Sequence, residues 1–263
     1  MREFQLHQIK ELVERWTRSL LGAVIFYTVI PLPQTWQMDF TRVARWATGI
    51  GLLLGGLLGL LEWSLQWLGM PILTRSAVVV AVWLGLTGGL HLDGAMDTAD
   101  GLAVLDKQRR LEVMQDSAAG AFGAIAAVLL LLLKTVALSD LGSPRWLALM
   151  AVAGWGRWGQ VVAIAFYPYL KPTGKGAFHK ETIRPLSDLA FGLVLLFTVS
   201  GVVTWLDPVR WWKGILLAFA GAAIAVITGT FFYWQFSGFT GDVYGAVVEW
   251  TEAIFLCLLT IFF

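Results

Sequence analysis

The chain has 263 residues, of which 57% are hydrophobic and 14% are charged, and its formal net charge is +1. A mean hydropathy of +0.70 excludes an ordinary soluble domain, and the near-neutral charge does not point to a nucleic-acid partner. The lone cysteine, Cys257, excludes an intrachain disulfide. Composition therefore predicts a single integral membrane domain over residues 1–263, in which the membrane body itself has to carry out any chemistry.

Residues 1–19 predict an interfacial amphipathic helix, because apolar residues recur there at helical spacing with charged residues between them. This stretch is too charged for the apolar core of a signal peptide. Residues 20–30 are apolar but few, and Pro31-Leu32-Pro33 ends the run. A run of this length is expected to form a re-entrant or partial helix rather than a full span.

Seven longer apolar segments follow, each near the length that a bilayer requires. Their approximate bounds are Trp46–Leu68, Ser76–Leu92, Ala119–Leu138, Trp146–Leu170, Leu186–Leu206, Gly214–Phe236 and Val243–Phe263. Five glycines in the first segment indicate close helix contacts, or else mere tolerance of glycine toward lipid. The predicted fold class is an all-α, polytopic membrane helix bundle. It would have about seven transmembrane helices, the N-terminal amphipathic helix and one short partial helix.

The basic residues are distributed unevenly between the loops. If residues 20–30 do not cross, thirteen lysines and arginines lie on one side of the membrane and four on the other. The positive-inside rule then places the richer side in the cytoplasm. In this topology the acidic stretch 88–101, the loop 171–184 and the loop 237–242 all lie at the cytoplasmic face, where we expect the active site.

The stretch 88–101, Gly-Gly-Leu-His-Leu-Asp-Gly-Ala-Met-Asp-Thr-Ala-Asp-Gly, carries three carboxylates directly after an apolar run. Asp93, Asp97 and Asp100 stand at positions i, i+4 and i+7, within about 60° of one another around a helix. Like charges on one face repel, and oxygen-only ligands suit a hard cation such as Mg²⁺. A solvated acidic helix end is the alternative, but the apolar residues and glycines between the aspartates make a poor solvated face. The stretch therefore predicts a metal site.

Further charged residues follow the acidic stretch. Asp116 lies shortly before the third apolar segment and is a candidate fourth carboxylate. Arg109 and Arg110 are candidates for bidentate contacts with phosphate oxygens, although each alone is as readily explained as a membrane anchor. Carboxylates, arginines and glycines around one short loop fit a reaction in which Mg²⁺ bridges a diphosphate and a charged phosphate product leaves.

Arg157 lies in the middle of an apolar segment, where a cation requires a partner or a polar cavity. We expect it to bind a substrate phosphate or carboxylate; the alternative is a packing arginine paired with a buried acid. The loop 167–180 adds Lys171, Lys175 and His179 among glycines, which suits closure over an anionic substrate. A merely solvated basic loop would look similar.

Thr240 and Asp242 begin the last apolar segment and are candidate substrate-binding residues, but either could instead simply cap the helix. Glu249 lies seven residues after Asp242 on the same helical face. It is expected to meet Arg157 or a lysine.

Three motifs, in this order, resemble the cobalamin synthase family. They are the stretch 88–101, Met-x-Asp-Ser-x-x-Gly-x-Phe-Gly at 114–123 and Thr-Gly-Asp-x-x-Gly-Ala at 240–246. The resemblance covers nearly the whole chain and includes Phe-Tyr-Thr-Val-Ile-Pro-Leu-Pro at 26–33. Members of this family are adenosylcobinamide-GDP ribazoletransferases, integral membrane enzymes of the last steps of vitamin B12 assembly.

The resemblance implies a Mg²⁺-dependent transferase of the bacterial cytoplasmic (inner) membrane. It would join α-ribazole, or its 5′-phosphate, to adenosylcobinamide-GDP and release GMP. In this hypothesis Asp93, Asp97, Asp100 and Asp116 hold Mg²⁺, and Asp116 or Asp100 serves as the catalytic proton acceptor. The substrate-binding residues would be Arg109, Arg110, Arg157, Lys171, Lys175, His179, Thr240 and Asp242. A homo-oligomer, or a complex with other corrinoid-assembly enzymes, is left open.

Two other functions compete with this one. A CDP-alcohol phosphotransferase also uses an aspartate-rich motif with Mg²⁺, but the spacing of Asp97-Thr98-Ala99-Asp100 differs from its pattern. A cation-coupled transporter would have inverted repeats and acidic residues near the middle of the membrane. The sequence shows no such repeat, and its acidic stretch lies at one end of a predicted span.

Overall fold

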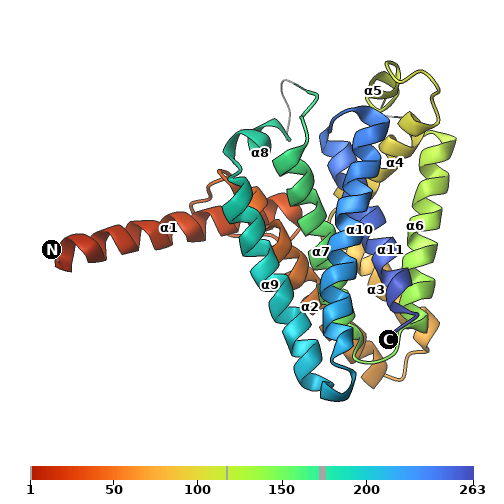
Figure 1. Ribbon diagram of the computed structural model, residues 1–263, viewed down its shortest axis with the longest axis horizontal. Coiled ribbons are helices and arrows are strands. Elements are labelled where there is room, and N and C mark those ends of the chain that lie inside the picture. Colours follow the sequence, from red (N-terminus) through yellow and green to blue (C-terminus); the bar gives the residue numbers. More distant parts are fainter. Residues whose placement is uncertain (1, 117, 172–175) are drawn as a thin grey trace.

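The computed structural model describes residues 2–116, 118–171 and 176–263, without the side chains of residues 2–6 and 9. This part of the chain forms eleven α-helices and two short 3₁₀-helices (Figure 1). They are α1 (Arg2–Tyr27), η1 (Val43–Trp46), α2 (Ala47–Trp67), α3 (Ile72–Leu86), α4 (Leu90–Leu102), α5 (Arg110–Val113), α6 (Ala121–Asp140), α7 (Arg145–Phe166), α8 (Ala177–Thr182), α9 (Pro185–Leu206), η2 (Pro208–Arg210), α10 (Trp212–Phe236) and α11 (Gly241–Leu259). The predicted all-α fold is confirmed.

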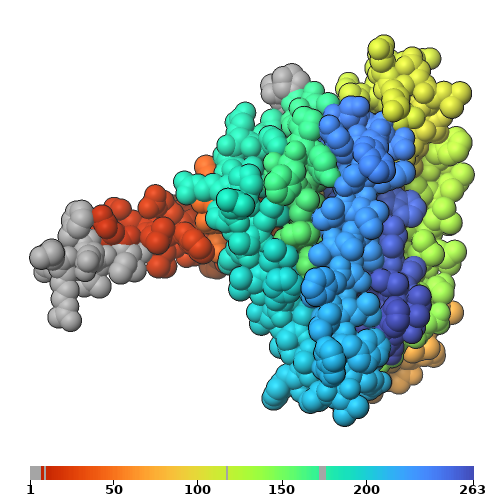
Figure 2. Space-filling model, in the orientation of Figure 1, coloured from red at the N-terminus to blue at the C-terminus, as the bar shows by residue number. Residues whose placement is uncertain are grey.

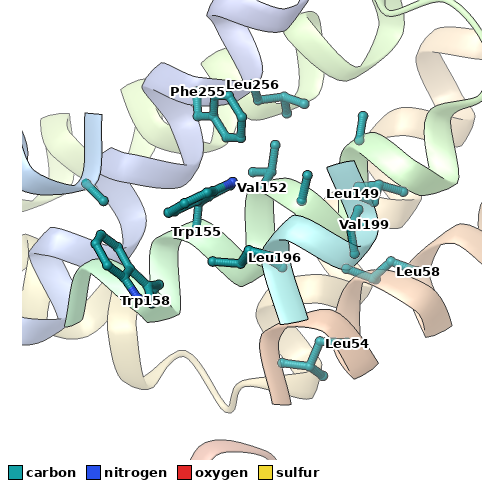
Figure 3. Packing of buried hydrophobic residues seen from close by; sticks show 14 of the residues in the cluster. Leu54, Leu58, Leu149, Val152, Trp155, Trp158, Leu196, Val199, Phe255 and Leu256 are labelled. Atoms are coloured by element: carbon teal, nitrogen blue, oxygen red, sulfur yellow. The ribbon is translucent and has the colours of Figure 1, made fainter. Parts of the chain in front are cut away.

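Helix α7 runs through the middle of the bundle and packs against α2, α9, α10 and α11. Nearly all of its residues are buried. Its Trp155 and Trp158 meet edge to face and belong to one buried cluster with leucines of α2 and α9 and with Phe255 of α11 (Figure 3). Helices α6 and α9 lie at the surface of the bundle (Figure 2). Both expose large apolar side chains, as a surface in contact with lipid would.

Three glycines at four-residue intervals let α2 approach α7 closely. A Cβ atom added to Gly55 would lie 2.4 Å from the Cα atom of Met150, and Gly51 and Gly59 are equally close to α7. Because lipid is as apolar as these side chains, close backbone packing rather than burial from water holds such helices together. The predicted close contacts are therefore present at these three positions, whereas Gly56 faces open space among the described residues.

The N-terminal region differs from the prediction of two separate elements. The amphipathic stretch and the apolar residues after it form one continuous helix, α1, because no helix-breaking residue lies between them. Its first part projects away from the bundle (Figures 1 and 2), while Ala23 and Tyr27 near its end are buried. A Cβ atom on Gly22 would lie 2.3 Å from the carbonyl oxygen of Asp39, so the following loop is packed tightly against α1.

All seven predicted apolar segments contain a helix, but their number exceeds the number of helices that could cross a membrane. Five helices are long and apolar enough, or six if the bent pair of α3 and α4 counts as one span. Helix α3 has only 15 residues and is followed by a bend of 90°, where Gly88 and Gly89 adopt φ angles of 61° and 70°. Helix α11 carries three acidic residues. The predicted count of about seven is therefore approximate.

The connections rich in polar residues gather at one end of the bundle. Helices α4, α5 and α8 lie at the same end, and the loop between α10 and α11 joins them there (Figure 1). The connections that contain η2 and the C-terminus of α6 lie at the opposite end (Figure 1). This arrangement brings the acidic stretch, the basic loop and the final motif together, as predicted from the loop pattern.

Candidate active site

A cavity of about 680 Å³ opens at the polar end of the bundle. Its wall is formed by the end of α1, the start of α4, the loop before α8, α8 itself and the start of α11. The polar and charged residues among its described lining are His91, Asp93, Gln160, Tyr169, Lys171, His179, Asp242 and Tyr244. Four of the predicted site residues thus line one cavity.

Two glycines bring the acidic helix α4 against α11. A Cβ atom on Gly94 would lie 2.6 Å from the carbonyl oxygen of Asp242, and one on Gly245 would lie 2.9 Å from that of His91. A larger residue at either position would push the helices apart. The close packing is what places Asp93 and Asp242, which come from motifs about 150 residues apart in the chain, in one cavity wall.

Negative charge accumulates along this face of α4. The pKa of Asp97 is raised to about 6, first because the carboxyl is partly buried and then because other carboxylates surround it. These neighbours are Asp93, Asp242 and Asp100, while Lys171 acts in the opposite direction. Four carboxyl groups and one lysine thus lie near one another, and a bound cation would be favoured by this excess of acidic groups.

Asp100 is engaged in holding the next helix. Its two carboxylate oxygens accept hydrogen bonds of 2.8 Å from the backbone N–H groups of Gly120 and Gly123, at the start of α6. A Cβ atom on Gly120 would lie 2.3 Å from the carboxylate, so glycine is required for this contact. Asp100 therefore caps α6, a role that the sequence analysis missed.

A cage of four aspartates is not formed. Among the residues that the structure describes, no three Asp, Glu, His or Cys side chains converge as a protein-only metal site would require. Asp116 lies exposed and accepts a hydrogen bond from the Ala118 N–H group. The remaining donors still fit Mg²⁺, which commonly takes one or two carboxylates and completes its shell with water and phosphate oxygens. Asp93 and Asp97 are the residues placed to supply them.

The basic loop is anchored to the final motif by backbone hydrogen bonds. The N–H group of Phe239 donates to the Pro168 carbonyl at 2.9 Å, and that of Leu170 donates to the Phe239 carbonyl at 2.8 Å. The next residue, Lys171, lies with its Nζ atom 3.4 Å from the Asp242 carboxylate. The loop therefore delivers one cation to the acidic side of the cavity. Lys175, also predicted to bind substrate, lies outside the described residues.

Thr240 caps the N-terminus of α11, which was the alternative to substrate binding for this residue. Its hydroxyl accepts a hydrogen bond from the Val243 N–H group and donates one of 3.1 Å to Asp242. Thr240 thus begins α11 and fixes the Asp242 carboxylate at the same time. Direct binding of substrate by Thr240 stays a prediction.

The two arginines of the α4–α5 connection lie apart from the described cavity lining. Arg109 is exposed. Arg110 is buried, and its guanidinium donates hydrogen bonds to the carbonyl oxygens of Val104, at 3.0 Å, and Gln235, at 2.7 Å. Arg110 therefore ties α5 to the end of α10, and its predicted phosphate contact has no support from this position.

Arg157 is paired with a buried acid, which was the alternative to substrate binding. Its guanidinium donates a hydrogen bond to Glu252 of α11, and both side chains are at most 1% exposed. The Lys134 ammonium of α6 donates to Glu252 and Glu249, both at 2.6 Å. Two cations and two acids thus neutralise one another inside the bundle. The expected contact of Glu249 with a lysine is present.

The cavity also contains residues that the sequence analysis did not select. They are His91, which belongs to the acidic stretch, and Gln160 and Tyr244, which lie within apolar segments. All three are at least 94% buried and line the cavity. The signal that the sequence offers for Gln160 and Tyr244 is a polar side chain inside an apolar segment. Their side-chain positions follow only from the packing of α4, α7 and α11.

Comparison with known proteins identifies the family of the chain. Residues 19–260 match the family described as Cobalamin-5-phosphate synthase. A relative from Trichormus variabilis, named adenosylcobinamide-GDP ribazoletransferase, is 58% identical over 243 residues, which cover 92% of this chain and 96% of the relative. Relatives of the same name from Synechocystis and Synechococcus elongatus are both 48% identical over 246 residues. They cover 92% and 94% of this chain, and 94% and 97% of their own lengths. No solved structure matches the chain. Because the match extends over nearly all of the chain and includes the motifs that form the cavity, the chain belongs to the cobalamin-5-phosphate synthase family.

Proposed function

We propose that this protein is an adenosylcobinamide-GDP ribazoletransferase, the activity for which its relatives are named. A hydroxyl oxygen of α-ribazole, or of its 5′-phosphate, attacks the phosphorus on the cobinamide side of the diphosphate. A new phosphorus–oxygen bond forms, the bond to the bridging oxygen breaks, and GMP leaves with that oxygen. The hydroxyl proton passes to an acceptor on the protein.

The observation that carries this proposal is the cavity shared by Asp93, Lys171 and Asp242. These residues come from three separate regions of the chain, and two of them belong to the motifs on which the family resemblance rests. A lysine beside carboxylates is suited to a substrate whose phosphates meet both a cation of the protein and a metal ion. A cavity of about 680 Å³ also falls within the usual range for ligand sites.

The same carboxylates support dependence on Mg²⁺. Asp93 and Asp97 would hold the ion, and Asp242 lies close enough to add its charge. A bound Mg²⁺ would supply Lewis-acid stabilisation of the charge that develops on the leaving phosphate. On the protein side, Lys171 would hold a phosphate oxygen through its ammonium group, and Thr240 would keep the Asp242 carboxylate in place.

For the proton acceptor we propose one of the cavity-lining carboxylates, Asp93 or Asp242, ahead of the earlier candidates. A general base has to reach the proton that it removes, directly or through one water. Asp100 holds the two amide groups of α6, and Asp116 is exposed outside the described cavity lining. The earlier prediction that Asp116 is the proton acceptor is tested by the experiment below.

We further propose that the protein spans the bacterial inner membrane with the cavity open to the cytoplasm. The apolar outer faces of α6 and α9 support the membrane location. The excess of lysine and arginine in the loops at the cavity end supports the orientation. Ion transport is not favoured, since the buried charges of Lys134, Arg157, Glu249 and Glu252 neutralise one another. No feature of the described residues specifically favours lipid synthesis.

The decisive assay uses purified protein in lipid nanodiscs with adenosylcobinamide-GDP and α-ribazole. We expect GMP release coupled to cobalamin formation, abolished by chelation and restored by Mg²⁺. Asp97→Asn should lower turnover by about 100-fold, because it removes a charge that the metal requires. Glu181→Gln, which changes an exposed acid in α8, is the matched control and should retain turnover within about twofold.

Two outcomes of this assay would contradict parts of the proposal. Folded wild-type protein that forms no product would exclude the assigned reaction. If Asp116→Asn abolished turnover while Asp93→Asn and Asp242→Asn retained it, the proton acceptor would be Asp116 and not a residue of the cavity wall.

A further inference from the structure

One part of the cavity wall is aromatic and uncharged. The side chains of Phe26, Phe178 and His179, which we call the aromatic wall, line the cavity side by side. The imidazole of His179 lies with its ring centroid 4.7 Å from that of Phe26, nearly perpendicular, and 4.0 Å from that of Phe178. Tyr27 lies behind, parallel to the imidazole within 17°. The end of α1 and helix α8 thus build this surface together.

His179 belongs to this wall as a neutral ring. Burial lowers its pKa to about 4, so the imidazole is uncharged near neutral pH and carries one N–H donor and one acceptor nitrogen. The residue is 2% exposed, and neither ring nitrogen has a hydrogen-bond partner within the described part of the chain. A buried polar group without a partner is unfavourable, so a ligand that supplies one would gain binding energy there.

Two more buried polar groups on the cavity wall are in the same condition. His91 is 1% exposed and Gln160 is 6% exposed. For both histidine nitrogens and the amide oxygen of Gln160, the described chain offers no hydrogen-bond partner. Around the aromatic wall, the lining of the cavity therefore combines flat apolar surfaces with a few neutral hydrogen-bond donors and acceptors.

This combination excludes a phosphate as the ligand of the aromatic wall and favours a flat heteroaromatic ring. A phosphate would require cations or several N–H donors, which the wall lacks among its described residues. A planar ring instead stacks on Phe26 and Phe178 and uses an edge nitrogen to pair with a neutral imidazole. Lys171 and Asp242, which suit the charged part of a substrate, line another part of the same cavity.

The substrates of the proposed reaction offer three such rings, the adenine and the guanine of adenosylcobinamide-GDP and the benzimidazole of α-ribazole. Adenine and guanine carry several hydrogen-bonding groups along their edges, whereas the benzimidazole of a nucleoside has a single free ring nitrogen and is otherwise apolar. The neighbouring lining, Ile25, Phe40 and Leu90, is also apolar. We propose that the aromatic wall is the subsite for the benzimidazole ring of α-ribazole, with His179 as the partner of its free nitrogen. This inference rests on the proposed function.

The test measures binding and turnover separately on the full chain in nanodiscs. Equilibrium binding of α-ribazole alone, followed by its intrinsic fluorescence, is compared with binding of GMP. The variants are Phe178→Leu, which removes the stacking surface, and His179→Asn, which removes the imidazole. Phe191→Leu is the matched control, because Phe191 is an aromatic residue of α9 that packs on Trp16 and Trp46 rather than on the cavity wall. Thermal stability of each variant shows that it is folded.

We expect Phe178→Leu and His179→Asn to weaken α-ribazole binding by about tenfold, and to raise the KM for α-ribazole to the same degree. GMP binding and the KM for adenosylcobinamide-GDP should stay within about twofold. If the variants weaken GMP binding instead, the wall holds guanine and the inference is wrong. If folded variants bind both ligands like wild type, the wall holds neither the benzimidazole nor the guanine and the inference is also wrong.

Failure of the proposed function would look different from failure of the subsite. If wild-type protein binds α-ribazole but forms no cobalamin, and Phe178→Leu no longer binds α-ribazole, the subsite is supported and the reaction is wrong. If wild-type protein forms cobalamin and both variants have unchanged KM values, the reaction is supported and the subsite is wrong.

Discussion

His179 shows how far the surroundings of a residue can change its chemistry. In the sequence it follows two lysines in a glycine-rich loop and looks like one more cation for an anionic substrate. In the fold it lies among Phe26, Tyr27 and Phe178, and burial lowers its pKa from 6.5 to about 4. An imidazole that is half protonated at pH 6.5 in water is a neutral ring here at the same pH.

This shift predicts a pH-dependent stability. Between pH 6.5 and about 4 the unfolded chain binds a proton at His179 that the folded chain does not, so stability falls as the pH falls through this window. The full effect is on the order of 3 kcal/mol. Thermal unfolding between pH 4.5 and 7.5 should therefore show a smaller loss of Tm in His179→Asn than in wild type. His7→Asn, at an exposed histidine, should follow the wild-type curve, and an equally steep curve for His179→Asn would contradict the assignment.

At the scale of elements, Asp100 connects two helices. Helix α4 ends near the start of α6, and the Asp100 carboxylate accepts hydrogen bonds from two of the N–H groups that a helix leaves unpaired at its N-terminus. Negative charge at that end is also favoured by the helix dipole. The glycines of the Gly-x-Phe-Gly sequence at 120–123 leave room for the carboxylate.

Asp100→Ala is expected to destabilise the protein by about 1–2 kcal/mol, because both N–H groups of α6 lose their acceptor. Asp100→Asn keeps one acceptor oxygen, so its stability should lie between that of Asp100→Ala and that of wild type. Asp106→Ala is a suitable control, since Asp106 is exposed and accepts a hydrogen bond from one nearby amide, that of Gln108. Thermal unfolding without added metal measures the effect. Unchanged unfolding together with weaker Mg²⁺ binding would make Asp100 a metal ligand after all.

For the whole molecule, the buried group of Lys134, Arg157, Glu249 and Glu252 joins α6, α7 and α11. Charges inside a membrane protein are tolerated when they pair with one another, and here two positive charges face two negative ones. Helices α7 and α11 also bear Gln160 and Asp242 on the cavity wall. The ion group therefore fixes the relative position of helices on which the site depends, without itself lining the described cavity.

Removing one charge from this group should be more harmful than removing a pair. Lys134→Met leaves Glu249 and Glu252 without their shared cation and should cost about 3–5 kcal/mol, seen as a lower Tm and a lower yield of folded protein. The double variant Lys134→Met/Glu249→Gln keeps the Arg157–Glu252 pair and should recover much of the loss. Lys107→Met, at an exposed lysine, is the control. A double variant as unstable as the single one would show that the pairing is not the cause.

Much of the fold could be predicted from sequence, because the bilayer imposes the same length and composition on every helix that crosses it. The seven apolar segments all contain helices, and the positions of Gly51, Gly55 and Gly59 correctly indicate close packing. The predicted boundaries of individual helices were less accurate. Residues 20–27 continue α1, and α3 ends at Leu86, before the end of the predicted segment Ser76–Leu92, because local signals do not report how neighbouring segments pack.

For the site, the kinds of reactive groups could be read from the sequence: aspartates at helical spacing, a basic glycine-rich loop and a final motif with Thr240 and Asp242. The tertiary structure decided which of these groups share a cavity. Asp93, Lys171, His179 and Asp242 line it, whereas Asp100 caps α6, Arg110 ties α5 to α10, and Arg157 pairs with Glu252. The physical reason is that a carboxylate or guanidinium can bind a ligand, a helix end or another charge equally well. Only the packing of helices distant in sequence determines which partner is within reach.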